Sequence, residues 1–328
     1  MSDLTVTAVI PTRNRPVDLG KAVASVLLQT RLPDEFIIVD QSPGDESRVK
    51  VEELIARYRE ESQAATPGRD IRLLYLHDPT ITGLVEAKKV AAGKASGSIV
   101  CYLEDDIILE PEYIASIEQG FIEKPAMLGC CGVMTNMPRV PMGYLFFYRL
   151  FRRGIFIDER VNVQYGKQRE ERHLIPCITI CGGLSAWRRE VFAAVPFDVV
   201  NGFHMMEDVD FSTRVAAHFG PHLFINPKVR AEHHWSQANR EVRKAVYRRK
   251  LTETVLFYKK RAHIPWALFD LLWLLLGLLL EAFFKSLVKF STYPMSGYAA
   301  GLLAGMRKKL VVDMADPRPL PAALHEAR

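Results

Sequence analysis

Short apolar runs alternate with longer segments whose apolar residues recur at helical spacing over the first hundred residues of the chain. The runs typical of strands are residues 4–10, 36–39, 71–76 and 99–103, and Pro11 ends the first of them. The segments typical of helices are residues 17–29, 46–60 and 84–94. Such alternation predicts parallel strands joined by right-handed crossovers, and therefore an α/β fold whose ligands bind where the strands end.

The middle of the chain has a less regular pattern. Residues 143–154 mix aromatic side chains with arginines, which fits either a surface insertion or, as we prefer, an acceptor-binding lobe. Order returns with residues 177–192, which predict a strand, a Gly-Gly turn and a short helix. Residues 223–233 predict a further strand, and its alternation places His233 on one face and His234 on the other.

The last ninety or so residues combine basic and apolar segments. Residues 240–261 carry nine Lys or Arg beside an apolar helical stripe. Residues 264–284 form an apolar stretch that, as a helix, would be about 31 Å long, close to the ~30 Å hydrocarbon core of a bilayer. A second apolar helix is predicted over residues 286–306, where glycines at every fourth position give a small-residue face.

Two acidic side chains interrupt the long apolar stretch. Asp270 and Glu281 fall with Gly277 on one narrow stripe of the predicted helix, which suits a helix packed on a partner or lying in the membrane interface. A charge inside a spanning helix is unfavourable unless it is paired. Because basic residues flank the apolar block on both sides, we expect residues 240–310 to attach to the cytoplasmic leaflet as a peripheral or re-entrant element, in preference to a single span.

Composition sets limits on the class of protein. The chain has 328 residues, of which 48% are hydrophobic and 25% charged, so it can bury a core and is neither disordered nor collagen-like. Residues 237–328 hold 16 Lys and Arg against 7 Asp and Glu, a net charge of +9 that leaves −4 for the rest of the chain. We attribute the basic excess to a membrane and expect no nucleic-acid partner.

The cysteines and the N-terminus bear on the compartment. The five cysteines are odd in number, lie mostly in apolar runs and lack CxxC spacing, so we expect reduced, buried thiols and a cytosolic catalytic part. No basic segment precedes an apolar stretch at the start, and we therefore expect no cleaved signal peptide.

Three adjacent carboxylates follow the apolar run 99–103. Glu104, Asp105 and Asp106 repel one another and would lose hydration in a crevice, so a cation is their natural partner. If strand alternation continues, Glu104 and Asp106 share one ligand while Asp105 points elsewhere. Oxygen ligands without a nearby Cys or His favour Mg²⁺ or Mn²⁺ over Zn²⁺. Capping of the helix after Pro111 explains the same tripeptide equally well.

A second pair of acids, Glu207 and Asp208, begins another helical pattern, where carboxylates can also act as caps. The chain contains neither GxGxxG nor GxxxxGK[ST]. The phosphates of a ligand would therefore need a metal in place of a glycine-rich loop.

Six segments, taken in this order, resemble the inverting glycosyltransferases of glycosyltransferase family 2. The segments are TAVIPTRNRPVDLGKAVASVLLQT, FIIVDQSPGD, ITGLVEAKKVAAGKASG, CYLEDDIIL, CGGLSAWRREVF and EDVDFSTR, within about residues 4–235. The resemblance implies an α/β chain with the GT-A fold and a mainly parallel mixed sheet. It also implies a nucleotide-diphosphate sugar as donor and a divalent metal, Mn²⁺ or Mg²⁺, as cofactor.

The resemblance also implies roles for individual residues. It assigns metal binding to Asp106 with Glu104, and to His233 or His234. The general base is Asp208, and Glu207 beside it orients the acceptor or the loop. The implied donor contacts are Pro11, Thr12, Arg13, Asp40, Lys88, Glu104 and Asp105.

Four positions depart from the usual family pattern. Glu104 stands where Asp is usual, and Gln41 where a second acid is frequent. Lys88 and Lys89 stand where Arg and Asn are common, and Lys offers a point charge where Arg offers a planar fork. These departures affect donor recognition and leave the proposed metal and base positions intact.

We therefore expect a bacterial, inverting glycosyltransferase at the cytoplasmic face of the inner membrane, capable of homo-oligomerisation, that glycosylates a lipid-linked or polysaccharide acceptor. The expected domains are residues 1–236 for catalysis, 237–263 as a basic helix, 264–310 as apolar helices and 311–328 as a flexible tail. An alternative is a catalytically weak, sugar-nucleotide-binding or scaffold subunit of a membrane complex. Nucleotidyl transfer is less favoured, because EDVDFSTR fits an acceptor base better.

Overall fold

The computed structural model describes residues 4–65, 71–236 and 243–311. They fall into two compact units, each assembled from segments distant in sequence. The first unit draws on Met1–Met137, Arg160–Phe197 and His222–Asn239, and the second on Pro138–Glu159, Asp198–Pro221 and Arg240–Arg328. The division into a catalytic domain ending at residue 236 and separate C-terminal helices stays a prediction. The expected tail lies outside the described residues apart from Val311.

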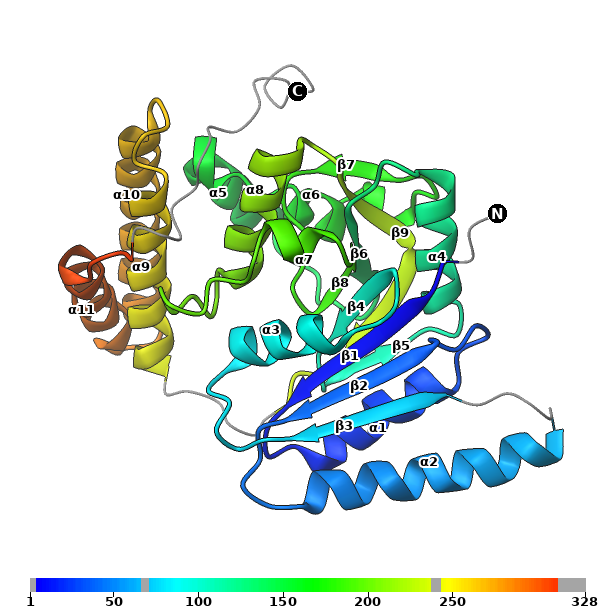
Figure 1. Cartoon of the computed structure of the whole chain (residues 1–328). Coiled ribbons are helices and arrows are strands. Elements are labelled where there is room, and N and C mark those ends of the chain that lie inside the picture. The colour runs from blue at the N-terminus through cyan, green and yellow to red at the C-terminus, as the bar shows by residue number, and fades with distance from the viewer. Residues whose placement is uncertain (1–3, 66–70, 237–242, 312–328) are drawn as a thin grey trace. The chain divides into compact units, whose positions relative to one another are not determined.

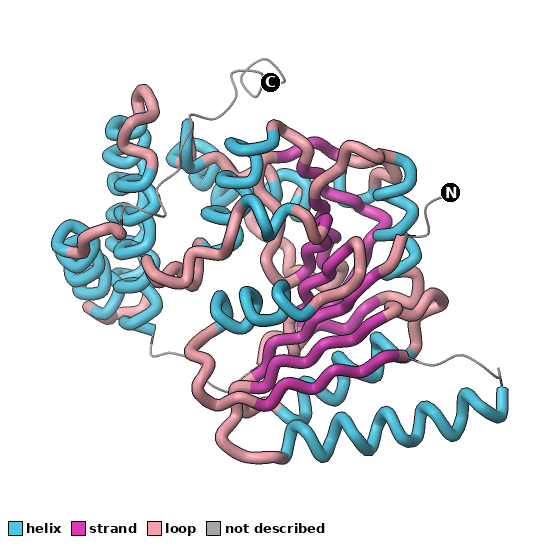
Figure 2. Tube along the Cα trace, in the orientation of Figure 1, coloured by secondary structure: helices cyan, strands magenta, loops and turns pink. Residues whose placement is uncertain are grey.

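The first unit is organised around a mixed sheet with the strand order β3-β2-β1-β4-β8-β6-β9-β5, and β7 pairs with β9 (Figure 2). Its parallel part comprises β1 (Val6–Thr12), β2 (Glu35–Asp40), β3 (Arg72–His77) and β4 (Ile99–Leu103). The connecting helices are α1 (Pro16–Leu27), α2 (Glu46–Ala65) and α3 (Leu84–Lys94). Figure 1 shows α1 and α2 on one side of these strands and α3 on the other. The predicted parallel α/β half is thus confirmed.

The other half of the sheet is mainly antiparallel, so the sheet as a whole is mixed, as the family resemblance implied. Its strands are β5 (Ile107–Leu109), β6 (Gly129–Met134), β7 (Ile175–Cys177), β8 (Leu184–Arg188) and β9 (Leu223–His233). β8 runs antiparallel to β4 and β6, and β5 and β7 run antiparallel to β9. The intervening helices are α4 (Tyr113–Glu123), α6 (Arg160–Tyr165), η2 (Lys167–Glu170) and α7 (Val191–Ala194).

Two local expectations about the strands are wrong. Pro11 does not end β1, because it still pairs with Val39 of β2. The ladder between β1 and β4 reaches only Val9, so the missing N–H of Pro11 does not interrupt it. After the Gly-Gly turn the chain forms β8 before the short helix α7, since Leu184 and its neighbours complete the buried sheet beside β4.

The sheet of the first unit curls strongly. Only Glu104, Asp105 and Asp106 separate β4 from β5, although β8, β6 and β9 lie between these strands in the sheet order. The hydrophobic core beneath the sheet includes Ile10, Phe36, Cys101 and Phe121. All five cysteines are free thiols and four are buried, which agrees with the expectation of reduced cysteines. The curl leaves the three acids at the point where the two halves of the sheet meet.

The second unit is helical. It contains α5 (Met142–Phe151), η1 (Gly154–Phe156), α8 (Glu207–Phe219), α9 (Arg243–Lys260), α10 (Ala267–Val288) and α11 (Tyr293–Arg307). The three predicted C-terminal helices are confirmed, with shifted ends. α10 begins after Trp266, whose φ of 65° lies in the left-handed region. The core of this unit joins Phe156, Phe257, Leu274 and Tyr298.

The glycines of α11 explain how closely α11 packs on α9. A Cβ atom at Gly301 would lie 2.4 Å from the carbonyl oxygen of Arg248, and one at Gly305 would lie 2.8 Å from Cβ of Val255. Such distances exclude any side chain without movement of the α9 backbone. The small-residue face predicted for residues 286–306 therefore serves helix packing within the protein.

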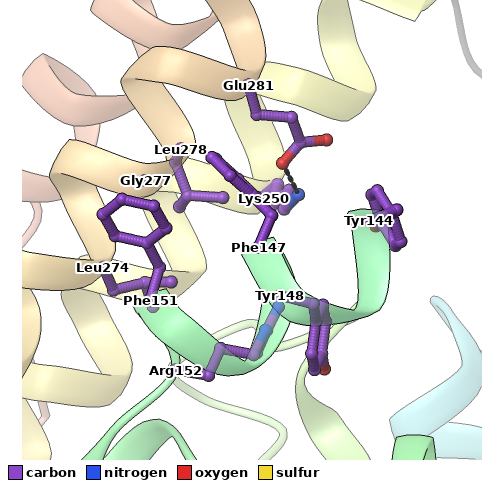
Figure 3. A pocket seen from close by; sticks show the side chains of 10 residues that line it. All are labelled: Tyr144, Phe147, Tyr148, Phe151, Arg152, Lys250, Leu274, Gly277, Leu278 and Glu281. Atoms are coloured by element: carbon purple, nitrogen blue, oxygen red, sulfur yellow. Dashed lines mark hydrogen bonds and ion pairs between the residues drawn. The ribbon is translucent and has the colours of Figure 1, made fainter. Parts of the chain in front are cut away.

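The polar stripe of α10 also packs on protein. Asp270 accepts a hydrogen bond from the backbone N–H of Ile155 in η1 at 3.2 Å. A Cβ at Gly277 would lie 2.3 Å from the ring of Phe151, so this glycine admits α5. Glu281 pairs with Lys250 of α9 at 3.2 Å, as Figure 3 shows beside the aromatic side chains of α5. Of the two expected roles of this stripe, packing is the one observed, and it packs on other helices of the same protein.

The opposite side of α10 is exposed and apolar. Leu268, Leu272 and Leu287 are 55%, 57% and 55% exposed. Among the described residues, α10 is the one helix long and apolar enough to cross a membrane, and 39% of its most apolar window is buried within the protein.

Candidate functional site

Glu104 and Asp106 meet His233 at the curl of the sheet. One ligand atom from each residue lies within 4.8 Å of the other two. Nε2 of His233 is 3.1 Å from an oxygen of Asp106 and 3.6 Å from an oxygen of Glu104. Glu104 and Asp106 therefore share one focus, as we expected, although they lie in the connection between β4 and β5 and not in a strand.

Strand register brings the histidine to the acids. In the antiparallel pair of β5 and β9, His233 lies opposite Ile107, the residue after Asp106. The backbone N–H of His234 donates to the carbonyl oxygen of Asp106, which fixes this register. The imidazole of His234 points instead to Glu232 at 2.9 Å, on an exposed part of the surface. The structure therefore places the imidazole of His233, and not that of His234, beside Glu104 and Asp106.

Asp105 faces away from this focus. Its carboxylate accepts hydrogen bonds from the hydroxyl of Thr12 at 2.7 Å and from the guanidinium of Arg15 at 2.8 Å. Arg15 also lies 3.7 Å from Asp106. Sequence reasoning chose Arg13, which is exposed, and missed Arg15. The second arginine of PTRNRP was available in the sequence, but nothing there indicated which of the two turns toward the acids.

The three acidic groups differ in electrostatic environment. Burial raises the pKa of Asp105 in spite of Arg15 and Thr12. Burial acts in the same direction on Asp106, but hydrogen bonds from His233 and from the N–H of Ser236 lower its pKa below the ordinary value. Burial opposes the charged form of His233, yet Asp106 and Glu104 raise its pKa. The site thus favours the ionised form of Asp106.

The donor atoms fit a divalent cation. Two carboxylates are typical ligands of Mg²⁺ and Mn²⁺, and the imidazole of His233 shifts the preference towards a transition-metal ion such as Mn²⁺. No Cys or His lies close to these acids in sequence, and only the family resemblance pointed to His233 or His234. Residue 233 reaches the acids through the β5–β9 pairing.

Asp40 closes the neighbouring strand end. It is fully buried, and its two carboxylate oxygens accept hydrogen bonds from the phenol of Tyr75 at 2.6 Å and from the N–H of Ser42 at 2.9 Å. Burial and then the hydrogen bond to Asp40 raise the pKa of Tyr75. Gln41 accepts from the N–H of Gly83, where α3 begins. The departure at residue 41 therefore has a structural use at the start of α3.

Lys88 and the Gly-Gly turn support Glu104. The ammonium of Lys88 is buried and donates to the carbonyl oxygen of Gly182 at 3.0 Å. The N–H of Glu104 donates to the carbonyl oxygen of Gly183 at 3.1 Å. A Cβ at Gly183 would lie 2.3 Å from Cδ of Glu104, so a glycine here leaves room for the longer acid. Lys88 thus holds the turn against which Glu104 rests.

The second unit carries the other acid pair at the start of α8. Glu207 is buried, and Asp208 is half-buried with one oxygen accepting a hydrogen bond from the N–H of Val209 at 2.8 Å. The three preceding N–H groups, of residues 204–206, all donate to one oxygen of Glu253 in α9. Glu253, which sequence reasoning did not single out, therefore fixes the entry to α8.

Asp210, one turn into α8, lies in a different environment. It is buried among Arg214 at 2.9 Å, Lys260 at 2.7 Å and Arg261 at 3.4 Å. Although burial opposes ionisation, these cations lower the pKa of Asp210 to about 2. A carboxylate held so strongly in its ionised form is a poor proton acceptor, which leaves Asp208 as the better candidate for a base on this helix.

Comparisons with known proteins agree with this geometry. The sequence model named Glycosyl transferase family 2 matches residues 7–195. The chain is similar in structure to mannosyltransferase PcManGT from Pyrobaculum calidifontis, solved with GDP-Man and Mn²⁺. This likeness has a TM-score of 0.57 at 17% identity, covering 94% of this chain and 88% of that chain. A search of curated proteins finds no match.

Two further solved structures share the fold. The structure of residues 1–349 of TarS from S. aureus gives a TM-score of 0.56 at 13% identity and covers 96% of this chain and 81% of that chain. GalNAc-T7, solved with UDP, GalNAc and Mn²⁺, gives 0.52 at 17% identity, covering 79% of this chain and 51% of that chain. The expected α/β architecture of the GT-A type is thereby confirmed.

Proposed function

The chain belongs to glycosyltransferase family 2, and we propose that it transfers a sugar with inversion from a nucleotide-diphosphate donor to a lipid-linked or polysaccharide acceptor. The meeting of Glu104, Asp106 and His233 is the observation that carries this proposal. It supplies a divalent-cation site in a chain that lacks a phosphate-binding glycine loop.

The first unit is proposed to bind the donor. Glu104, Asp106 and His233 would hold a divalent ion, which when bound neutralises charge on the leaving diphosphate. The ion pair of Arg15 with Asp105 holds both side chains in place beside the proposed metal ligands. Asp40, Thr12 and Pro11 lie at the ends of β1 and β2, and we propose that this edge receives the nucleoside.

Asp208 is proposed as the general base. An acceptor hydroxyl is a weak acid at neutral pH, and a carboxylate that receives its proton contributes about 10² to 10⁴ in rate. Direct attack of the acceptor opposite the leaving group inverts the anomeric centre and needs no covalent nucleophile. The motif EDVDFSTR and the unsuitability of Asp210 support the choice of Asp208.

Attachment to the cytoplasmic surface of a bacterial inner membrane is part of the proposal. α10 has an exposed apolar side, and α5 also carries exposed apolar side chains, with Met142 and Phe146 at 79% and 69%. The other side of α10 packs through Asp270 and Glu281, so these acids need not enter lipid. A helix with one side packed and the other apolar suits a position within the membrane interface better than a span surrounded by lipid.

The substitution Asp208→Asn tests the enzymatic proposal. The amide keeps an oxygen for the N–H of Val209 but cannot take a proton, so turnover should fall by about 10² or more. Purified protein would be incubated with Mn²⁺, a panel of sugar nucleotides and membrane extract. Mass spectrometry would then identify and quantify the products. Donor affinity and melting temperature should remain near those of the wild type.

Each alternative has a distinct result in the same experiment. Near-normal turnover of Asp208→Asn would reduce Asp208 to a helix cap. Absence of transfer and of Mn²⁺-dependent donor hydrolysis by the wild type would favour a sugar-nucleotide-binding or scaffold subunit.

A further inference from the structure

A groove of about 580 Å³ lies on the second unit between α9, α11 and the loop that leads into α8. Arg248, Arg249, Lys308 and Glu253 contribute its charged side chains. We propose that this groove binds a phosphate group of the acceptor, together with a neighbouring hydroxyl. This inference rests on the proposed function, because it names a chemical feature of the acceptor.

The charges of the groove favour an anion. Three permanently cationic side chains face one carboxylate among its lining residues. Arg248 is exposed, Arg249 is half-buried, and the two are adjacent on α9. Guanidinium groups bind phosphate oxygens through paired, charge-assisted hydrogen bonds. The ammonium of Lys308 donates to the carbonyl oxygen of Asn201 at 2.7 Å, which holds this cation at the wall formed by the loop.

The inner wall has unused capacity to accept a hydrogen bond. Glu253 is 2% exposed, and one of its oxygens receives all three N–H groups of residues 204–206. Its other oxygen, Oε1, has no hydrogen-bond partner among the described residues. A buried acceptor without a donor is unfavourable, so a hydroxyl that displaced the cover of this oxygen and reached it from the groove would be stabilising. The combination of guanidinium groups and a carboxylate matches a phosphorylated sugar.

The position of the groove indicates the acceptor as its ligand. Residues 204–206, which Glu253 holds, lead directly into Glu207 and Asp208. A ligand in the groove therefore lies beside the segment that carries the proposed base. The phosphate could belong to a lipid carrier or to a soluble phosphorylated saccharide, and both present the same chemistry to Arg248 and Arg249.

The smaller cavity in Figure 3 differs from the groove in volume, in lining and in the pairing of its charged side chains. It measures about 60 Å³ and is lined mostly by aromatic and aliphatic side chains of α5 and α10. Its cation Lys250 already pairs with Glu281, which in turn contacts Lys285 at 2.6 Å. The groove, with its excess of positive charge, is the better phosphate site.

Direct binding by the full-length protein tests the proposal without donor, metal or turnover. Binding of inorganic pyrophosphate in the presence of a chelator would be measured by calorimetry. Binding of the protein to phosphatidylcholine vesicles, with and without phosphatidic acid, would be measured by flotation. The double variant Arg248→Gln with Arg249→Gln should weaken phosphate-dependent binding by about tenfold or more. Arg243→Gln with Lys244→Gln, which removes two exposed charges of the same helix outside the groove, should bind as the wild type does.

The two probes distinguish the sources of the phosphate. Selective loss of pyrophosphate binding in the groove variant supports a soluble ligand, and selective loss of the phosphatidic acid effect supports a lipid carrier. Equal affinities of the groove variant and the control variant for both probes would overturn the proposal. Because this assay contains no sugar nucleotide, its failure would leave the proposed transferase activity standing, and failure of that activity would leave the binding result intact.

Discussion

The two units bury charge in opposite ways. In the first unit three carboxylates lie between β4 and β5, and the basic side chains described beside them are Arg15 and His233. In the second unit Asp198 and Asp210 are buried with more cations than acids, including Lys260 and Arg261. A fully enclosed cluster in which each acid contacts a cation has a structural role, because removal of one partner leaves a buried charge unpaired. Acids that converge on one point without matching cations instead prepare a place for a metal ion.

Removal of Asp210 from the enclosed cluster that it forms with Asp198 and the neighbouring cations should have the largest effect on stability. Asp210→Asn would leave Arg214, Lys260 and Arg261 without their shared carboxylate, and breaking such a buried network costs about 3–5 kcal/mol. Chemical denaturation should show this loss. Glu232→Gln, an exposed acid paired with His234, is the control and should change stability by less than about 1 kcal/mol. A similar small change for Asp210→Asn would contradict the structural role of the cluster.

The same carboxylate predicts an acid limit. The pKa of Asp210 is lowered to about 2 from an ordinary value near 3.8, so its ionised form stabilises the fold at pH values above about 4. That contribution, roughly 2 kcal/mol, should be lost as the pH falls through about 2. Denaturant titrations from pH 6 to pH 2 would measure it. If Asp210→Asn and wild type lose stability in parallel over this range, the pKa of Asp210 is not lowered in the folded protein.

Close helix packing gives an intermediate effect. Gly301→Ala places a methyl group 2.4 Å from the backbone carbonyl of Arg248, so α11 must move away from α9 at a cost of about 1–3 kcal/mol. Gly143→Ala, where an added Cβ meets no atom within 4 Å, is the matched control. The melting temperatures of the two variants would be compared, and that of Gly301→Ala should be the lower. Equal values would show that α11 is not held closely against α9.

The smallest effect is expected at Asp105. This acid faces Thr12 and Arg15 and does not join the focus of Glu104 and Asp106. Asp105→Asn keeps an acceptor for Thr12 and should weaken metal-dependent donor binding by only a fewfold. The affinity would be measured by calorimetry with a nucleoside diphosphate and Mn²⁺. A loss much larger than a fewfold would contradict this expectation and place Asp105 among the metal ligands.

Local sequence signals were sufficient for part of this picture. The run 99–103 followed by three acids predicted β4 and a cation site, and the stripe of Asp270, Gly277 and Glu281 predicted a packed face of α10. Both signals depend on residues that are neighbours in sequence or on one helix. The resemblance to a family added the order of the donor and base segments.

Long-range pairing explains what the sequence did not reveal. The choice of His233 over His234 depends on the register of β9 against β5, and the choice of Arg15 over Arg13 depends on how the loop after β1 turns. Glu253 gives no motif because its function arises from three N–H groups about fifty residues earlier. Such contacts are set by tertiary packing, which no short pattern encodes.

The central claim is that Glu104, Asp106 and His233 hold a divalent ion. Titration of Mn²⁺ into the full-length protein, followed by electron paramagnetic resonance of the free ion with and without nucleoside diphosphate, tests it most directly. Asp106→Asn keeps an oxygen for the N–H of Ser236 but removes the charge, and it should weaken Mn²⁺ binding by about 10². Glu232→Gln should leave binding unchanged. Equal Mn²⁺ affinities for the wild type and Asp106→Asn would contradict the account.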